Sequence, residues 1–211
     1  PVNDGIPGPL RRILEFNERV AQALYSPNRL APEFSRELAV MPRENGHVGL
    51  MKPTALDDWT VQLVGAVDRR LPLTAIKELP AHEMTTEFKC VEGWSRIVHW
   101  KGVRLADLLQ KYGAPSPYVG LSTPLDGVTP SGHPDRYMVG LDRNSAMHPQ
   151  TLLAYEMNGE PLTQGHGAPL RLVTTLKYGY KQIKRISVID LTSDRPPDYW
   201  AQRGYDWYGG H

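Results

Sequence analysis

The sequence contains a single cysteine, Cys90, among 211 residues. One cysteine cannot form an internal disulfide bond, which excludes the bridged framework of many small secreted proteins. Lys and Arg (24) nearly balance Asp and Glu (23), so the basic excess typical of nucleic-acid-binding proteins is lacking too. No apolar run approaches the roughly 18 residues that span a bilayer, and the first residues do not read as a secretory signal.

Repeats, low-complexity tracts and clean linkers are also lacking, and we predict one domain over residues 1–211. Glycine and proline, at 19 each, favour turns and short strands over a helical bundle. Helical spacing predicts helices over 8–26, 73–80 and 104–113. Alternating apolar and polar residues, together with the Asn158-Gly159 hairpin signal, predict strands over 58–67, 83–90, 96–100, 118–123, 136–141, 152–162, 168–175 and 185–193. This mixed order predicts an α+β fold.

Cys90 lies where the alternating strand 83–90 ends. With Met84 and Phe88 on the same strand face, its side chain is expected to point inward. Three interpretations are open: a small buried apolar residue, a catalytic thiol paired with His99, or a thiolate ligand to a soft metal. Multi-cysteine zinc spacing and an HExxH pattern are absent. A metal held by this one thiolate would therefore bring most of its ligands with it, as a cofactor does.

Cationic residues gather late in the chain. Arg171 leaves the apolar face of strand 168–175, so it either reaches solvent or contacts an anion. Around Gly179 lie four further cations, Lys177, Lys181, Lys184 and Arg185. Cations around a glycine turn with free N–H groups can cradle a phosphate, and an ordinary basic loop is the alternative.

An amide and a guanidinium stand side by side in the loop 26–34, at Asn28 and Arg29 between two prolines. Such a pair suits a planar ligand rich in heteroatoms through paired hydrogen bonds. Ordinary turn chemistry is the alternative interpretation.

Several segments, taken in order, resemble the molybdopterin-binding domain of the sulfite oxidase superfamily. They are FKCVEGWS, AMHPQTLLAYEMNGEPL, GHGAPLRLV and KYGYKQIKRI. Within that superfamily the likeness points to the catalytic subunits of bacterial protein-methionine-sulfoxide reductases, whose cysteine segment reads C-V-E-x-W-S. The resemblance runs from about Asn28 to Trp200. It implies the β-rich, mixed sulfite-oxidase catalytic-domain fold, with few short helices.

The resemblance implies a molybdenum-molybdopterin cofactor in which one protein thiolate binds the metal and the pterin dithiolene supplies two more sulfurs. Cys90 matches that metal ligand, and Glu92 matches an acidic residue near the metal. Glu92 is the candidate for proton delivery or substrate placement, and a capping or surface acid is the alternative. His166 stands where the reductases have asparagine and the wider superfamily often has histidine. The implied cofactor-binding residues are Asn28, Arg29, Thr123, His166, Arg171, Gln182, Ile183 and Lys184.

The residues after the cysteine bear on the reaction that the resemblance implies. Sulfite oxidases continue with a Gly-Asn pair and arginines, whereas this chain has Val91, Glu92, Gly93 and Trp94. An acidic residue there disfavours sulfite, so we expect oxygen-atom transfer from a sulfoxide such as methionine sulfoxide. Leu176 replaces a tryptophan of the reductases, which leaves the exact substrate open. The alternatives are a related molybdenum enzyme that oxidises another small sulfur compound, and a non-catalytic pterin-binding protein.

The same likeness implies partners and a location. The chain has no C-x-x-C-H haem motif, so electrons must pass to or from a separate partner, such as a haem-containing membrane subunit. We expect a monomeric catalytic subunit, located in the periplasm or otherwise exported, that binds no nucleic acid.

Overall fold

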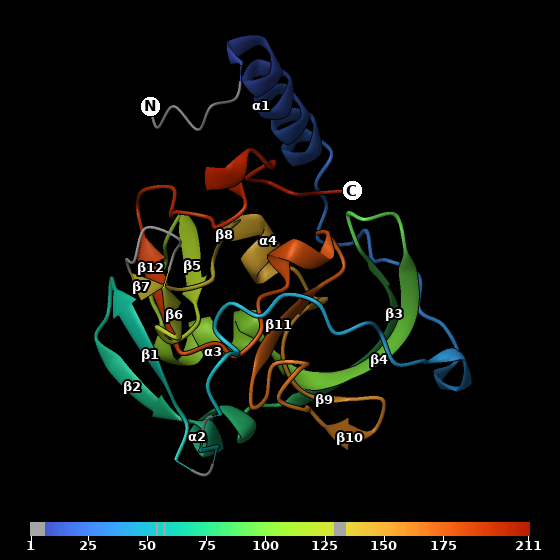
Figure 1. The fold of residues 1–211 in the computed structure, drawn as a ribbon, viewed down its shortest axis with the longest axis vertical. Coiled ribbons are helices and arrows are strands. Elements are labelled where there is room, and N and C mark those ends of the chain that lie inside the picture. The colour runs from blue at the N-terminus through green and yellow to red at the C-terminus, as the bar shows by residue number, and fades with distance from the viewer. Residues whose placement is uncertain (1–6, 54, 57, 129–133) are drawn as a thin grey trace.

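The computed structural model describes residues 7–53, 55–56, 58–128 and 134–211. Two five-stranded β-sheets lie side by side, with short helices packed between them (Figure 1). Helix α3 (Leu105–Tyr112) packs on the second sheet, and α4 (Arg143–Met147) contacts strands of both. Helix α1 (Gly8–Ala23) stands apart at the top of the view. The predicted β-rich α+β fold with few short helices is confirmed.

The first sheet has the strand order β2-β1-β12-β5-β8. Its strands β1 and β12 run parallel and its other neighbours run antiparallel. The strand bounds are β1 (Thr60–Gly65), β2 (Arg69–Pro72), β5 (Tyr118–Ser122), β8 (Met138–Asp142) and β12 (Val188–Thr192).

The second sheet has the order β10-β9-β4-β3, and β11 also pairs with β9. All of its pairs are antiparallel. Asn158 and Gly159 both have positive φ in the turn between β9 and β10, as the hairpin signal predicts. The strand bounds are β3 (Ala81–Lys89), β4 (Ser95–Arg104), β9 (Thr151–Met157), β10 (Glu160–Pro161) and β11 (Arg171–Thr174).

Strand β9 explains why the second sheet is covered on both faces. Leu153 and Tyr155 belong to the large core that the two sheets and α3 share. Leu152 and Ala154 point the other way, into a second cluster with Phe88, Val98 and Trp100. A strand buried on both faces reads as a nearly continuous apolar run, which the segment TLLAY provides.

Short elements depart from the sequence predictions. The structure adds β2 and α4, which the sequence pattern did not indicate, and confirms α2 (Leu73–Lys77). The region 124–135, predicted as a loop, contains a pair of two-residue strands, β6 (Gly127–Val128) and β7 (Pro134–Asp135). Residues 129–133 of that loop lie outside the described residues, as does the N-terminal stretch 1–6. Single 3-10 turns occur at Arg36–Leu38, Gly179–Lys181 and Ala201–Arg203.

None of the helices in the described ranges is long and apolar enough to cross a bilayer.

Gly102 in β4 should tolerate no side chain. It lies at a register shift against β9, and an added Cβ would stand 2.2 Å from the Leu153 carbonyl oxygen and 2.6 Å from the Ala154 Cα. Gly102→Ala is therefore expected to lower the free energy of unfolding in urea by about 1–3 kcal/mol. The control is Gly8→Ala, where a Cβ meets nothing within 4 Å. Equal unfolding free energies for the two variants would contradict this account.

Candidate active site and cofactor-binding cavity

A cavity of about 250 Å³ opens beside the turn that joins β3 to β4. Its walls come from four regions of the chain: the segment before β1, the end of β3 with the cysteine turn, Tyr137 just before β8, and the C-terminal part from His166 onward. The lining residues are Pro42, Arg43, Asn45, Gly46, Val48, Phe88, Cys90, Val91, Glu92, Tyr137, His166, Arg171, Gly179, Tyr180, Gln182, Ile183, Lys184, Tyr199, Trp200 and Tyr205.

The backbone of the cysteine turn presents Cys90 to this cavity. The Cys90 N–H donates to the Trp94 carbonyl at 2.9 Å, and the Gly93 N–H donates to the Cys90 carbonyl at 3.1 Å. Gly93 has φ +87°, a left-handed conformation that favours glycine. The thiol is partly buried at the end of the strand, so it can meet a ligand inside the cavity.

The surroundings of Cys90 do not favour a free thiolate. Burial, and next the charge of Glu92, raise the pKa of the Cys90 thiol, while the Glu92 backbone N–H and the Asn45 side chain lower it. A nucleophilic cysteine normally needs a depressed pKa. His99, the proposed partner for a catalytic thiol, is instead buried within the second sheet, where its Nδ1 lies 2.9 Å from the Thr85 hydroxyl. Metal ligation, which holds a thiol deprotonated, suits this site better.

Arg171 is a buried cation at the floor of the cavity. It is 2% exposed, which rules out the solvent-facing alternative of the sequence analysis. Its Nη1 and Nη2 donate to the carbonyls of His166 and Gln182, at 3.1 and 3.3 Å, and its Cζ lies 4.9 Å from the Trp100 ring centroid. Nε lacks a hydrogen-bond partner, and no carboxylate pairs with this guanidinium, among the described residues. Burial lowers the pKa of Arg171 to about 10.

Two further predicted residues, Lys184 and His166, lie at this end of the cavity. Lys184 Nζ donates to the carbonyls of Asn45 and Gly165, at 2.7 and 2.8 Å. Burial, and next the charge of Arg171, lower the pKa of Lys184 to about 8, while Glu44 opposes the shift. Burial and Arg171 also lower the pKa of His166, whose Nε2 lies 3.6 Å from Glu44 Oε1.

Gln182 and Ile183 complete the predicted group. The Gln182 amide nitrogen donates to two carbonyls, those of Thr174 and Lys177, and its Oε1 is left without a partner among the described residues. Ile183 is 1% exposed, and its carbonyl accepts from the Leu172 N–H. This end of the cavity thus carries unsatisfied polar atoms next to buried positive charge.

Three predicted cofactor contacts lie away from these residues. Asn28 and Arg29 are exposed in the loop after α1, where the Asn28 N–H donates to the Ser26 hydroxyl. Thr123 is buried beneath Gly49, next to Val48 of the cavity wall, and its hydroxyl accepts from the Tyr137 N–H. The structure therefore groups Cys90 and Glu92 with the predicted residues between His166 and Lys184. The cofactor contacts of Asn28, Arg29 and Thr123 stay predictions.

The four cations around Gly179 do not form one phosphate cradle. Only Lys184 of the four lines the cavity. Lys181 is fully buried, and its Nζ pairs with Asp198 Oδ2 at 2.5 Å and donates to the Trp207 carbonyl at 2.6 Å. Arg185 donates to the carbonyls of Ala168, Gly49 and Lys52. Lys177 lies over the Tyr208 ring. These three cations hold loops together.

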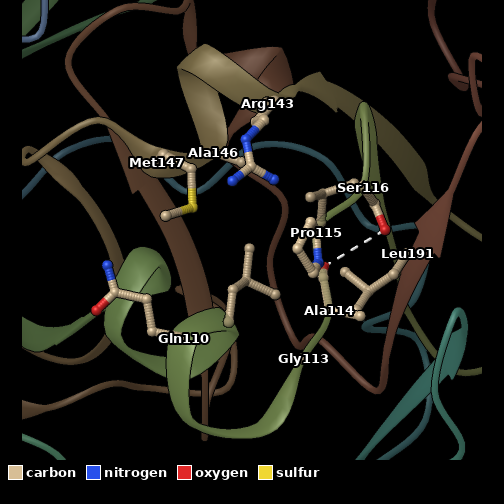
Figure 2. A pocket seen from close by; sticks show the side chains of 11 residues that line it. Gln110, Gly113, Ala114, Pro115, Ser116, Arg143, Ala146, Met147 and Leu191 are labelled. Carbon is tan, nitrogen blue, oxygen red and sulfur yellow. Dashed lines mark hydrogen bonds between the residues drawn. The ribbon is translucent and has the colours of Figure 1, made fainter.

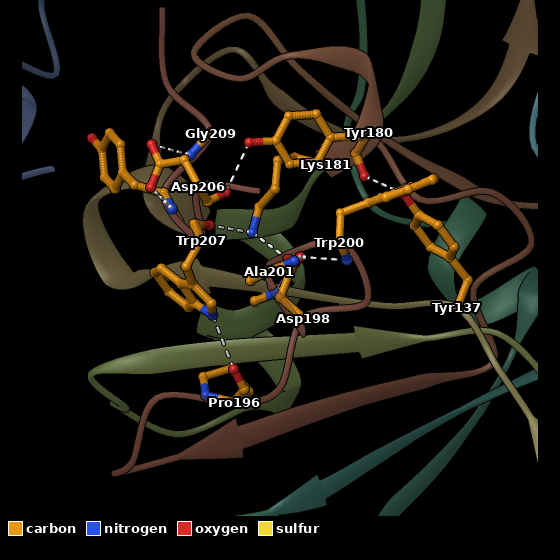
Figure 3. A network of polar contacts seen from close by, with 12 residues as sticks. Tyr137, Tyr180, Lys181, Pro196, Asp198, Trp200, Ala201, Asp206, Trp207 and Gly209 are labelled. Atoms are coloured by element: carbon orange, nitrogen blue, oxygen red, sulfur yellow. Dashed lines mark hydrogen bonds and ion pairs between the residues drawn. The ribbon is translucent and has the colours of Figure 1, made fainter. Parts of the chain in front are cut away.

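The sequence analysis missed the aromatic wall of the cavity, which the C-terminal segment provides. Tyr199 stacks on Tyr137 at 5.0 Å, and Trp200 lies 4.9 Å from Tyr205, measured between ring centroids. Figure 3 shows how the wall is fastened: Asp198 accepts from Lys181 and from the N–H groups of Trp200 and Ala201, while the Tyr180 hydroxyl donates to the Asp206 carbonyl. The one sequence signal was the aromatic richness of residues 195–211.

A second cavity, of about 180 Å³, lies between α3, the 113–116 turn and α4 (Figure 2). Its lining is mostly aliphatic, and Arg143 is the one ionisable side chain among the described residues that line it. It offers no group suited to hold a metal or transfer a proton to a substrate.

The first cavity fits the cofactor that the sequence resemblance implies. Arg43, Arg171 and Lys184 outweigh Glu92 among its lining charges, which suits an anionic phosphate. Aromatic side chains suit a planar heterocycle, and Cys90 offers one sulfur. The described residues hold no cluster of three or more His, Cys, Asp or Glu that could bind a metal ion. A metal at Cys90 would thus take its remaining ligands from the cofactor.

The charge on Lys184 should make anion binding depend on pH. Because the pKa of Lys184 is lowered to about 8, its ammonium is present below that pH and lost above it. Sulfate keeps its charge, so the affinity of the cofactor-free protein for sulfate should fall between about pH 7 and about pH 9, by up to about tenfold per unit above pH 8. Isothermal titration calorimetry measures this. Lys184→Gln should bind weakly at both pH values, and a wild-type affinity that is equal at both would refute the role of Lys184.

The curated relatives include methionine-sulfoxide reductase subunits. YedZ1 of Azospira oryzae, provisionally named as such a subunit, is 30% identical over 99% of this chain and 78% of its own length. The MsrP catalytic subunit of Xanthomonas campestris pv. campestris is 36% identical over 75% of this chain and 52% of its own. That of Campylobacter jejuni is 34% identical, over 77% and 58%. The chain thus spans little more than half the length of these MsrP proteins.

Among solved structures, the sulfane dehydrogenase SoxCD from Paracoccus pantotrophus shares the fold, with a TM-score of 0.58 and 18% identity over 69% of this chain and 41% of its own. Residues 47–200 match the family described as the oxidoreductase molybdopterin binding domain. These findings confirm the resemblance and the cofactor predicted from the sequence. The chain belongs to this molybdopterin-binding oxidoreductase family of the sulfite oxidase superfamily.

Proposed function

We propose that the protein reduces a sulfoxide to a thioether, with methionine sulfoxide as the reference substrate. The reaction takes one oxygen atom from sulfur, consumes two electrons and two protons, and releases water. The observation that carries this proposal is Glu92, an exposed carboxylate that lies beside Cys90 and lines the cavity. Its negative charge repels an anion such as sulfite but not a neutral sulfoxide. The names of the relatives support the same substrate class.

The residues of the chain take complementary roles in this reaction. When bound, the molybdenum cofactor supplies the oxygen-atom and electron transfer. Cys90 provides the one protein sulfur ligand, while Arg171 and Lys184 bind the anionic end of the pterin. Glu92, which accepts a hydrogen bond from the Trp94 indole at 3.0 Å, lies where it can relay protons from solvent to the substrate. Trp200, with the other rings of the aromatic wall, excludes water from the interior of the cavity.

The electron source belongs to the same proposal. We propose that the two electrons come from a separate partner, a haem-containing membrane subunit. The printed names of the MsrP relatives, which specify a catalytic subunit, support a division of this kind. We also propose that the protein works as a monomeric subunit outside the cytoplasm.

A paired assay tests the direction and the substrate. Purified protein made with a competent cofactor supply is given methionine sulfoxide and a reduced dye, and in parallel sulfite and an oxidised acceptor. Dye oxidation that depends on methionine sulfoxide, with little sulfite turnover, is the expected result. Sulfite turnover that exceeds sulfoxide turnover would overturn the substrate assignment, and protein without molybdenum by elemental analysis would overturn the enzyme assignment.

Cys90→Ser should abolish turnover and leave the fold intact. Serine is similar in size, and the site is partly exposed, so the thermal unfolding midpoint should change little. A serine hydroxyl is a poor ligand for a soft metal, so turnover should fall by more than about 100-fold, beyond the usual effect of residues that only orient metal ligands. Steady-state assays and circular dichroism check both expectations. Retained turnover would refute metal ligation by Cys90.

Arg171→Ala should lower the cofactor content of the purified protein. The variant removes a buried positive charge that no carboxylate within the described residues neutralises, so the anionic end of the pterin loses its partner. Pterin fluorescence after oxidative release, together with elemental analysis, measures the content per chain. Arg96→Ala, an exposed arginine on β4, is the matched control and should keep normal content. If the two variants hold equal amounts of cofactor, Arg171 is not a cofactor contact.

A further inference from the structure

Helix α1 exposes an apolar stripe to solvent. The five side chains of the stripe are between 40% and 61% exposed, and they are Leu10, Ile13, Phe16, Val20 and Leu24. At 100° per residue they fall within an arc of about 120° on one side of the helix. The helical spacing of these apolar residues predicts the helix correctly, but the apolar face that it identifies is exposed and does not pack against the core.

The opposite side of α1 holds the helix to the body. Glu18 is 5% exposed and pairs with Arg195, and Gln22 donates to Glu18 at 3.2 Å. Just beyond the helix, the Tyr25 hydroxyl donates to the Asn144 carbonyl at 3.0 Å. In Figure 1 the helix stands clear of both sheets, with the C-terminal segment beneath it. The apolar stripe accordingly faces away from the protein.

An exposed apolar stripe of this kind indicates that a binding partner covers it. Contiguous apolar patches are uncommon on free protein surfaces and mark interaction sites. A helix of this length gains most of its stability by packing its apolar face. The residues along one margin of the stripe indicate the chemistry of the occupant, because Arg12 and Arg19 are both exposed there, seven positions apart on the same side.

Charge argues against a second copy of the chain as that occupant. Twofold, antiparallel packing of two α1 stripes places the same margin of each helix against itself. In the register that places the twofold axis at the midpoint of the helix, Arg12 and Arg19 would face the Arg19 and Arg12 of the other copy, and like charges repel there, although Glu15 lies between them on the same margin. An anionic surface instead pairs with the arginines while it covers the stripe.

We propose that α1 lies along an anionic lipid bilayer, with its apolar stripe in the acyl boundary and Arg12 and Arg19 at the phosphate headgroups. Amphipathic helices with aromatic and aliphatic residues on one face and arginines beside them bind membrane surfaces in this way. The interaction needs no change in the catalytic cavity, none of whose lining residues lies on α1. It therefore stands independently of the proposed reaction.

Vesicle flotation with the full chain tests the proposal. Wild-type protein should float with vesicles that contain phosphatidylglycerol, and added salt should weaken the binding. The double variant Ile13→Ser/Phe16→Ser should bind at least about tenfold more weakly, because it removes two side chains that become buried. Arg12→Gln/Arg19→Gln should reduce binding to the level seen with pure phosphatidylcholine. Leu125→Ser removes an equally exposed apolar side chain elsewhere and should float like wild type, as should Arg96→Gln.

Three results would overturn the proposal. One is that wild-type protein floats with neither type of vesicle, and another is that the α1 variants float as well as Leu125→Ser. The third concerns the competing occupant: analytical ultracentrifugation without lipid would find a dimer that Ile13→Ser/Phe16→Ser dissociates. Far-ultraviolet circular dichroism of each variant confirms that α1 is still folded.

Discussion

The cavity of the candidate site is built around positive charge that is buried without a carboxylate to pair with it in the described part of the chain. Arg171 is almost fully shielded from water, its Nε is unsatisfied among the described residues, and Lys184 lies in the same cavity. Burying unpaired charge costs free energy, and an anionic cofactor removes much of that cost. The bound cofactor should therefore stabilise the folded chain as well as equip it for chemistry.

The cations that follow β11 illustrate how one short segment serves two purposes. Lys184 faces the cavity, whereas Lys181 forms a buried ion pair with Asp198. That pair fixes the backbone just before Tyr199 and Trp200, so the aromatic wall is anchored to the same segment that carries the cation for the cofactor. Ligand binding and closure of the cavity are thus built on neighbouring residues.

Much of the fold was predictable because alternation and helical spacing are local properties. The strand pattern also predicted an inward-pointing Cys90 at the place where the chain leaves β3, whereas for Arg171 it left solvent and an anion as open alternatives. The aromatic wall was not predictable, because Tyr199, Trp200 and Tyr205 follow no period and reach the cavity by the path of the chain. For α1 the period identifies an apolar face, but it does not say what covers that face.

The order in which the walls of the cavity are made has a consequence for assembly. A ribosome produces the segment around Asn45 first, then the cysteine turn, and Tyr205 last of the lining residues. Until the C-terminal segment is synthesised and Asp198 pairs with Lys181, one side of the cavity stays open to solvent. Closure of that side of the cavity therefore depends on the docking of the C-terminal segment through the Lys181–Asp198 pair.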